Sequence, residues 1–190
     1  DIGLIAMMTV VLYLIGRGAV RTANEESLHK YRTAAWLQEV VRHYGAAHAA
    51  ITHSFGGMVL AYAMVQGLAV GRTACIAAPA RVEFLVERFA RIMAMPDTVV
   101  TNLGERLEQR FDRDIWDLLA TDANARRLDV PALVIHDEQD SSVPWQQGRR
   151  IADAWAGARF IRTQGLGHSR ILRDPAVLLL DEATSSLDAE

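Results

Sequence analysis

Apolar residues recur at helical spacing between residues 24 and 44 and predict an amphipathic helix there. The apolar positions are Leu28, Tyr31, Leu37, Val40, Val41 and Tyr44. Asn24 is a favourable cap for the first turn, and Gly45 supplies the left-handed backbone with which many helices end. We therefore expect the helix to stop at this glycine.

Short, largely apolar runs follow this helix and predict buried strands. Residues 46–53 form the first run, and Ser54 to Gly57 turn from it into an apolar helix over 58–68. Residues 72–79 and 158–163 predict two further strands, and residues 130–144 predict a strand that continues into a loop. A serine therefore stands at a tight junction between a strand and a helix.

Helix-forming residues dominate the segment from 81 to 125. Phe84, Leu85, Phe89, Ile92 and Met93 fall on one side of its first predicted helix, which Pro96 interrupts. An amphipathic helix buries one apolar face whatever its function, so a plain packing layer is one interpretation of this segment.

Composition fits one domain with a buried core, since the chain has 190 residues and 51% of them are hydrophobic. The 20 basic and 23 acidic residues give a net charge of −3, so the chain lacks the positive field with which proteins bind nucleic acid. Lys30 is the only lysine and no glycine precedes it, which excludes a Gly-Lys-Ser/Thr phosphate loop.

Cys75 is the only cysteine, so neither an internal disulfide nor a thiolate metal cluster can form. It lies in the predicted strand at 72–79, where a thiol acts as a small apolar group. This cysteine usage fits a reducing compartment, and we expect a cytoplasmic protein.

The N-terminal residues 2–16 form an uncharged apolar run between Asp1 and Arg17. A membrane span needs about 20 apolar residues, a length that this run reaches only by including Arg17 and continuing to Val20. A transmembrane helix, which would make the protein membrane-associated, and a buried core element are both open interpretations. Because no basic segment precedes the run, we expect a piece of a longer protein rather than a secretory signal.

The C-terminal residues 177–190 contain the run VLLLDEATSSLD, an apolar stretch that ends in Asp181 and Glu182. This run resembles the metal-binding strand and following loop of an ATP-binding-cassette ATPase, and residues 1–23 are weakly similar to a transmembrane helix of such exporters. The resemblance implies that Asp181 holds a metal ion through water and that Glu182 polarises the attacking water. Without a phosphate loop, however, two solvated carboxylates are the favoured interpretation.

Ser54 has the sequence setting of a nucleophile. A serine at a strand-to-helix turn is exposed at the sheet edge, and the N–H groups of the new helix point toward the oxyanion that forms when it attacks a carbonyl. The pattern Gly-x-Ser-x-Gly is present over residues 52–56, except that Thr52 occupies the first glycine position. We expect its side chain to strain or slow the site.

A candidate acid and a candidate base follow further along the chain. Asp137 and Asp140 stand at the two ends of the acidic run after the third predicted strand, and His168 follows Gly165 and Gly167 after the fourth. A histidine can take a proton from a serine when a carboxylate orients its other ring nitrogen.

Three motifs in this order resemble the α/β-hydrolase superfamily: HSFGG at 53–57, HDEQDSSVP at 136–144 and GLGH at 165–168. The likeness covers about residues 32–176 and implies an α/β fold with a partial, mostly parallel sheet, helices on both faces and a helical lid at about 81–125. It implies that Ser54 is the nucleophile, Asp140 the orienting acid and His168 the general base, with the Phe55 N–H in the oxyanion hole. It implies no metal or organic cofactor.

Each of these residues also has a purely structural interpretation. A serine before a helix is commonly a cap, and an acid after a strand commonly forms a turn. The family pattern gives Asp137 no place in the triad. We expect His53 to pack beside the serine and His136 to end its strand, and neither spacing indicates a metal site.

The resemblance further implies that the strands before the nucleophile strand are missing, because residues 1–45 are too few to hold them. The loop that supplies a second oxyanion N–H would be missing with them. The outer edge of the nucleophile strand would be exposed, which favours self-association unless residues 2–16 cover it.

We therefore predict an α/β-hydrolase-like domain over 24–176, between an apolar segment at 1–23 and the tail at 177–190. Its predicted activity is that of an esterase-like serine hydrolase on a small-molecule acyl substrate, with truncation impairing it. The alternatives are a transporter fragment or fusion without autonomous ATPase activity and a folded, inactive binding module. We expect no nucleic-acid partner, and we do not favour a membrane contact through residues 2–20.

Overall fold

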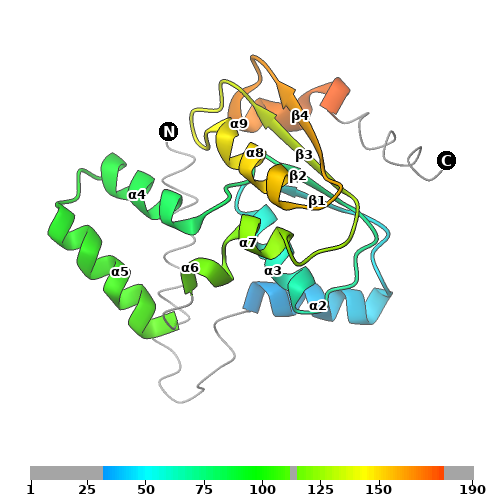
Figure 1. The fold of residues 1–190 in the computed structure, drawn as a ribbon, viewed down its shortest axis with the longest axis horizontal. Coiled ribbons are helices and arrows are strands. Elements are labelled where there is room, and N and C mark those ends of the chain that lie inside the picture. The colour runs from blue at the N-terminus through cyan, green and yellow to red at the C-terminus, as the bar shows by residue number, and fades with distance from the viewer. Residues whose placement is uncertain (1–31, 112–114, 178–190) are drawn as a thin grey trace.

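Four strands lie side by side in one parallel sheet, with the order β1-β2-β3-β4 (Figure 1). The computed structural model describes residues 32–111 and 115–177. The strands are β1 (Ala50–His53), β2 (Thr73–Ile76), β3 (Ala132–Asp137) and β4 (Arg159–Thr163). Because all four run in the same direction, the chain segments that leave them at their carboxyl ends share one edge of the sheet.

The two central strands are buried along their whole length, as their sequences TACI and ALVIHD predict. Their register pairs Ala74 with Leu133 and Cys75 with Val134. Alternate residues point to opposite faces, so Cys75 and Val134 enter one apolar cluster while Ala74 and Leu133 enter another. The sheet therefore has a core on each face.

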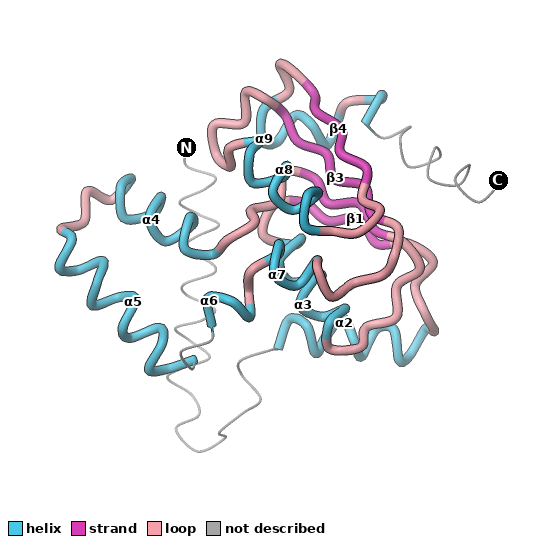
Figure 2. Tube along the Cα trace, viewed as in Figure 1, coloured by secondary structure: helices cyan, strands magenta, loops and turns pink. Residues whose placement is uncertain are grey.

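Helices that precede or follow the strands cover the first face (Figure 2). They are α2 (Arg32–Tyr44), α3 (Gly56–Val65), α7 (Thr121–Ala125) and α8 (Trp145–Ala154). Helix α2 ends where the sequence predicts, because Gly45 has a φ of 91° and its N–H donates to the Val41 carbonyl at 2.8 Å. Helix α3 is apolar on all sides and buried between the sheet and its neighbours.

The second face is covered by the segment that follows β4. Helix α9 (Gly167–Arg170) leads into the 3-10 helix η2 (Ile171–Arg173). Ile171 is fully buried and, with Val177, packs against Ala74, Ile76 and the β3 side chains of this face. The described structure thus has helices on both faces of a parallel sheet, as the sequence predicts.

A helical insertion separates β2 from β3 and extends away from the sheet (Figure 1). It contains α4 (Val82–Ile92), α5 (Asp97–Phe111) and α6 (Ile115–Leu118) before α7. The break between α4 and α5 lies at Pro96, as predicted. Leu85 of α4 packs with Met58 of α3, and Phe55, Phe84 and Phe89 surround this pair.

The outer side of β1 has no strand beside it within the described residues. Ile51 on this strand is 56% exposed, although it is a large apolar residue. Within those same residues, no helix is long and apolar enough to cross a membrane. The predictions for residues 1–31 and 178–190, including the apolar run and Asp181 and Glu182, lie outside the described part of the chain.

Candidate active site

Ser54 occupies a strained turn between β1 and α3. Its φ is 55°, in the left-handed region that non-glycine residues seldom adopt, and such strain is typical of a nucleophile held at a strand-to-helix turn. The Ser54 N–H donates to the Ile76 carbonyl at 2.9 Å, and the Gly57 N–H donates to the Ser54 carbonyl at 3.0 Å. These two bonds hold the strained backbone in place.

Gly57 is required for this close packing of α3 against the end of β2. A Cβ atom on Gly57 would lie 2.7 Å from the Cβ of Ala78, which is too close for two carbon atoms. Gly57 therefore allows the turn to pack directly against the sheet.

The Phe55 N–H stands at the start of α3, next to Ser54. Within the described residues it has no hydrogen-bond acceptor, as expected for a donor at a helix N-terminus. The Phe55 side chain packs with Met58 and Leu85 and so fixes this part of the turn. The residue after Ser54 thus has a backbone donor that is unpaired within the described part of the chain.

Asp140 lies in the loop after β3, and its side chain is fully buried. Its Oδ1 accepts the N–H groups of Ser142 and Val143, both at 2.8 Å. Its Oδ2 faces two histidines, His168 and His136. The loop backbone therefore fixes the carboxylate and leaves one oxygen for imidazole partners.

His168, in α9, joins the acid to the serine. Its Nδ1 lies 2.7 Å from Asp140 Oδ2, and its Nε2 lies 3.1 Å from the Ser54 hydroxyl oxygen. Because a carboxylate only accepts, Nδ1 carries the hydrogen and Nε2 is free to accept the serine proton. The structure thus brings together all three residues that the family resemblance singles out.

A second histidine, His136, supports the acid from within β3. Its side chain is fully buried, and its Nε2 lies 2.8 Å from the Val143 carbonyl and 3.3 Å from Asp140 Oδ2. Burial by itself would raise the pKa of Asp140, but the hydrogen bonds from His136, His168 and the Val143 N–H outweigh it and hold this pKa well below its usual range. Asp140 therefore stays ionised.

His53 contacts the backbone of His168. Its Nε2–H donates to the His168 carbonyl at 2.8 Å, and the two rings lie 4.7 Å apart between centroids. Burial lowers the pKa of His53 against the opposing effect of that hydrogen bond, so its ring favours the neutral form. The predicted packing of His53 beside the serine thus includes a polar contact with the histidine.

Asp137 is fully buried at the end of β3, although the family pattern gives it no catalytic place. It accepts hydrogen bonds from the Gln139, Leu166 and Gly167 N–H groups and from the Thr163 hydroxyl. Three of these donors belong to the strand and loop that lead to His168. Their separation of 26 to 30 positions from Asp137 is why no local sequence pattern indicates the contact.

A model of the Serine hydrolase family matches residues 17–173. The chain belongs to this serine hydrolase family. Over 54 residues it is 35% identical to the Putative carbamate hydrolase RutD of Pseudomonas savastanoi pv. phaseolicola (strain 1448A / Race 6). That match covers 28% of this chain and 21% of the relative, so the chain spans about a fifth of the length of the curated relative it matches.

Solved structures show the same fold. MGS-MChE2, an α/β-hydrolase enzyme from the metagenome of sediments from the lagoon of Mar Chica, Morocco, is 16% identical with a TM-score of 0.59, over 84% of this chain and 71% of that chain. An α/β-hydrolase superfamily protein from Enterococcus faecalis is 16% identical with a TM-score of 0.57, over 86% and 74%. These likenesses establish the α/β-hydrolase fold and lend no support to the exporter resemblance of residues 1–23 and 177–190.

Thr52 fits into this serine hydrolase without a short contact to the turn. A Cβ on Gly56 would lie 3.6 Å from the Thr52 Cβ, which is an ordinary distance. The Thr52 hydroxyl donates to the Ala74 carbonyl at 3.2 Å. The threonine therefore joins β1 to β2 with an additional hydrogen bond. That Thr52 slows the reaction stays a prediction.

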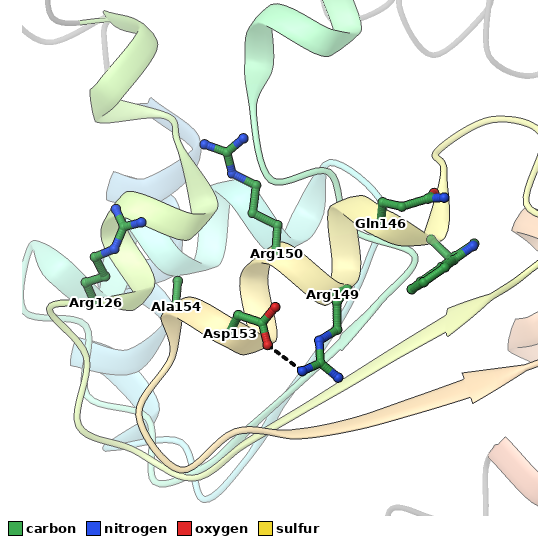
Figure 3. Close-up of a pocket in the computed structure, with 7 residues that line it drawn as sticks. Arg126, Gln146, Arg149, Arg150, Asp153 and Ala154 are labelled. Carbon is green, nitrogen blue, oxygen red and sulfur yellow. Dashed lines mark ion pairs between the residues drawn. The ribbon is translucent and has the colours of Figure 1, made fainter.

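A surface depression on α8 is lined by none of the three candidate site residues, Ser54, Asp140 and His168 (Figure 3). Its lining residues are Arg126, Trp145, Gln146, Arg149, Arg150, Asp153 and Ala154. Arg149 and Asp153 form an ion pair of 2.7 Å at its rim, and both side chains are about half exposed. These groups are solvated surface charges.

Proposed function

We propose that this serine hydrolase cleaves carboxylic esters or related acyl compounds through Ser54, His168 and Asp140. The observation that carries the proposal is the unbroken chain of hydrogen-bond contacts from the Ser54 hydroxyl through both nitrogens of His168 to a buried, ionised Asp140. Nucleophile, base and orienting acid stand at the distances that acyl transfer requires.

In the first half of the proposed reaction, His168 Nε2 takes the proton of Ser54 as its oxygen attacks the substrate carbonyl. Asp140 stabilises the imidazolium that forms. The tetrahedral intermediate collapses when His168 returns the proton to the leaving alcohol or amine, and an acyl ester on Ser54 remains.

In the second half, water attacks this acyl ester while His168 again accepts a proton. The carboxylic acid leaves, and the proton returns to Ser54. In both halves the Phe55 N–H would bind the oxyanion, a role supported by the absence of another acceptor for it in the described chain. No metal or organic cofactor takes part in these steps.

The apolar cluster beside the serine favours an apolar acyl group. Phe55, directly after the nucleophile, packs against Met58 and Leu85, and four residues of the helical insertion pack against the same pair: Val82, Phe84, Phe89 and Leu119. Ser54 itself is only 3% exposed, so the carbonyl that reaches it must be surrounded by protein. The insertion would thus serve as the lid that the family resemblance implies.

Labelling with a fluorophosphonate probe tests the proposal, because the probe phosphonylates a serine only when a base activates it. We expect the purified chain to be labelled on Ser54 and the Ser54→Ala and His168→Ala variants to remain unlabelled. Ser169→Ala is the matched control, since this exposed serine adjoins His168. A folded chain that the probe leaves unmodified would contradict the proposal.

A substrate panel follows from the same experiment. We expect hydrolysis of aryl esters with apolar acyl groups, measured by release of the phenol and abolished in Ser54→Ala. A carbamate belongs in the panel because the RutD relative is named a carbamate hydrolase. Turnover of the carbamate but none of the esters would replace the ester proposal with a carbamate substrate.

A further inference from the structure

Asp137 is a carboxylate that the proposed reaction does not use, yet it is fully buried next to the residues that do. A buried charge is costly unless hydrogen bonds compensate for its lost hydration. Here both oxygens are saturated. Oδ1 accepts the Gln139 N–H at 3.0 Å and the Gly167 N–H at 2.9 Å, and Oδ2 accepts the Thr163 hydroxyl at 2.9 Å and the Leu166 N–H at 3.0 Å.

These donors come from two segments that must be placed relative to each other. Gln139 belongs to the loop that carries Asp140, while Leu166 and Gly167 belong to the loop that carries His168. Gly167 directly precedes the histidine. The backbone adds a further link, because the Asp140 N–H donates to the Asp137 carbonyl at 3.2 Å. One residue therefore contacts both loops.

The histidine loop needs such an anchor because its own backbone is permissive. Gly165 and Gly167 have φ values of 82° and 64°, and glycine gives up more conformational freedom than other residues when it is held in one conformation. The Gln139 side chain also accepts the Gly165 N–H. Residues outside the loop thus decide where His168 stands.

We propose that Asp137 is a positioning residue that sets His168 at reaction distance from both Ser54 and Asp140. Asp137 cannot substitute for the acid, because the His168 Nδ1 already faces Asp140 and both Asp137 oxygens are occupied. This inference rests on the proposed function, since it assigns a role in acyl transfer to a residue outside the triad.

The Asp137→Asn variant keeps the size of the side chain but replaces one acceptor oxygen with an NH2 group. That NH2 group must face donors that already point at the site, so the loop has to shift. We expect the maximal rate of Ser54 modification by the fluorophosphonate, kinact, to fall about 10- to 100-fold, because a misplaced catalytic group lowers the rate by about this factor. The KI of the probe should stay within about twofold, because its binding contacts are unchanged.

Two further variants grade and control this experiment. Thr163→Val removes one donor and keeps the three backbone donors, so we expect a smaller loss in kinact, about two- to fivefold. Asp153→Asn alters a half-exposed acid on α8, whose carboxylate pairs with Arg149, and should leave kinact unchanged. Rates are normalised to the fraction of chain that the probe finally labels, so that unfolded protein does not count.

The outcomes separate the two proposals. If the wild-type chain is never labelled, the proposed function is contradicted. In that case the low-field proton NMR signal of the His168 Nδ1–H tests the placement of the histidine directly. Asp137→Asn must then weaken or shift this signal. If wild type is labelled and Asp137→Asn only lowers the melting temperature, with unchanged kinact per labelled site, the positioning role is wrong. Should Asp137→Asn fail to fold, an unchanged kinact in Thr163→Val overturns the proposal.

Discussion

The two oxygens of Asp140 illustrate how one residue serves structure and chemistry at once. Oδ1 is bound by two N–H groups of its own loop, and Oδ2 is bound by His168 and approached by His136. Every donor favours the charged form, which is why the pKa of this buried acid falls although burial opposes it. A permanent negative charge next to His168 stabilises the imidazolium that the proposed reaction creates.

Asp140→Asn removes this charge with little change in shape. The amide can offer an N–H to the His168 Nδ1, which favours the tautomer with its proton on Nε2 and so disables the base. We expect kcat/KM for an aryl ester to fall by about 10³- to 10⁴-fold, while KM changes little. Steady-state kinetics on the panel substrate measure both.

The matched control for this variant is Asp153→Asn, which changes a half-exposed carboxylate on α8 outside the triad contacts. It should retain wild-type kinetics. An Asp140→Asn variant with more than about a tenth of the wild-type kcat/KM would show that the carboxylate is dispensable and would contradict the triad.

At the level of residues, the sequence predicted those candidate site residues that lie within short motifs. Ser54, Asp140 and His168 each stand beside their own motif, so their meeting in space could be predicted from strand order. Asp137 could not be predicted as an anchor, because three of its four donors come from positions 163 to 167. Three acids in the run 137–140 and two glycines before a histidine were the signals present, and they do not specify which acid binds which loop.

At the level of elements, helix α8 approaches β3 very closely at Gly148. A Cβ on this glycine would lie 2.4 Å from the His136 Nδ1 and 3.1 Å from its Cβ. His136 is fully buried, so the ring has no free space into which it could move. The glycine thus lets α8 pack over the histidine that supports Asp140.

Gly148→Ala should therefore destabilise the protein, although alanine is the better helix former. We expect the free energy of unfolding to fall by about 1–3 kcal/mol, which is the usual effect of forcing an extra carbon atom into a packed core. Because the ring that moves contacts Asp140, kinact with the fluorophosphonate should fall as well. Chemical denaturation and labelling kinetics measure the two effects.

Gly104→Ala in α5 is the matched control. Among the described residues its Cβ would meet only the Trp116 ring, at 3.9 Å, so the ordinary gain in helix propensity should appear, up to about 1 kcal/mol. If both variants gained stability, the close approach of α8 to His136 would be wrong.

Predicted and observed elements agree where a pattern is long or a turn residue is decisive. Gly45 directly follows the end of α2, and Pro96 lies in the break between α4 and α5, directly before α5 begins. The two buried runs at 72–79 and 130–144 contain β2 and β3. Helix α8 was not predicted, because its sequence WQQGRRIADA is short and mostly polar, and within it only Gly148 and Ile151 are buried. Contact with β3 stabilises this helix more than its own pattern does.

At the level of the whole molecule, β1 is an edge strand that carries an exposed apolar side chain. Within the described residues no strand pairs with its outer side, and Ile51 on this strand is exposed. We expect the chain to self-associate through this edge, with a sedimentation coefficient that rises with concentration. Ile51→Lys should reduce the rise, because a charge opposes pairing of strand edges.

Val99→Lys supplies the control for that experiment, since Val99 is a comparably exposed apolar residue on α5, distant in sequence from β1. It should leave the concentration dependence unchanged. A chain that sediments as a monomer at every concentration would show that the edge does not mediate association.

Acid stability links the anchored carboxylates to the folding of the whole molecule. The folded-state pKa of Asp137 lies below its usual value, because hydrogen bonds from Gly167, Leu166, Thr163 and Gln139 outweigh the burial that would raise it. A group with a depressed folded pKa contributes stability that is complete above the unfolded value of about 4 and is lost as the pH falls through the folded pKa. Melting temperatures of wild type and Asp137→Asn should therefore differ most above about pH 5 and converge below about pH 4.

Asp153→Asn, which removes a half-exposed surface carboxylate, should follow the wild-type curve at every pH. Parallel curves for wild type and Asp137→Asn down to low pH would mean that the charge of Asp137 does not stabilise the fold, and that its loop is held by the backbone alone.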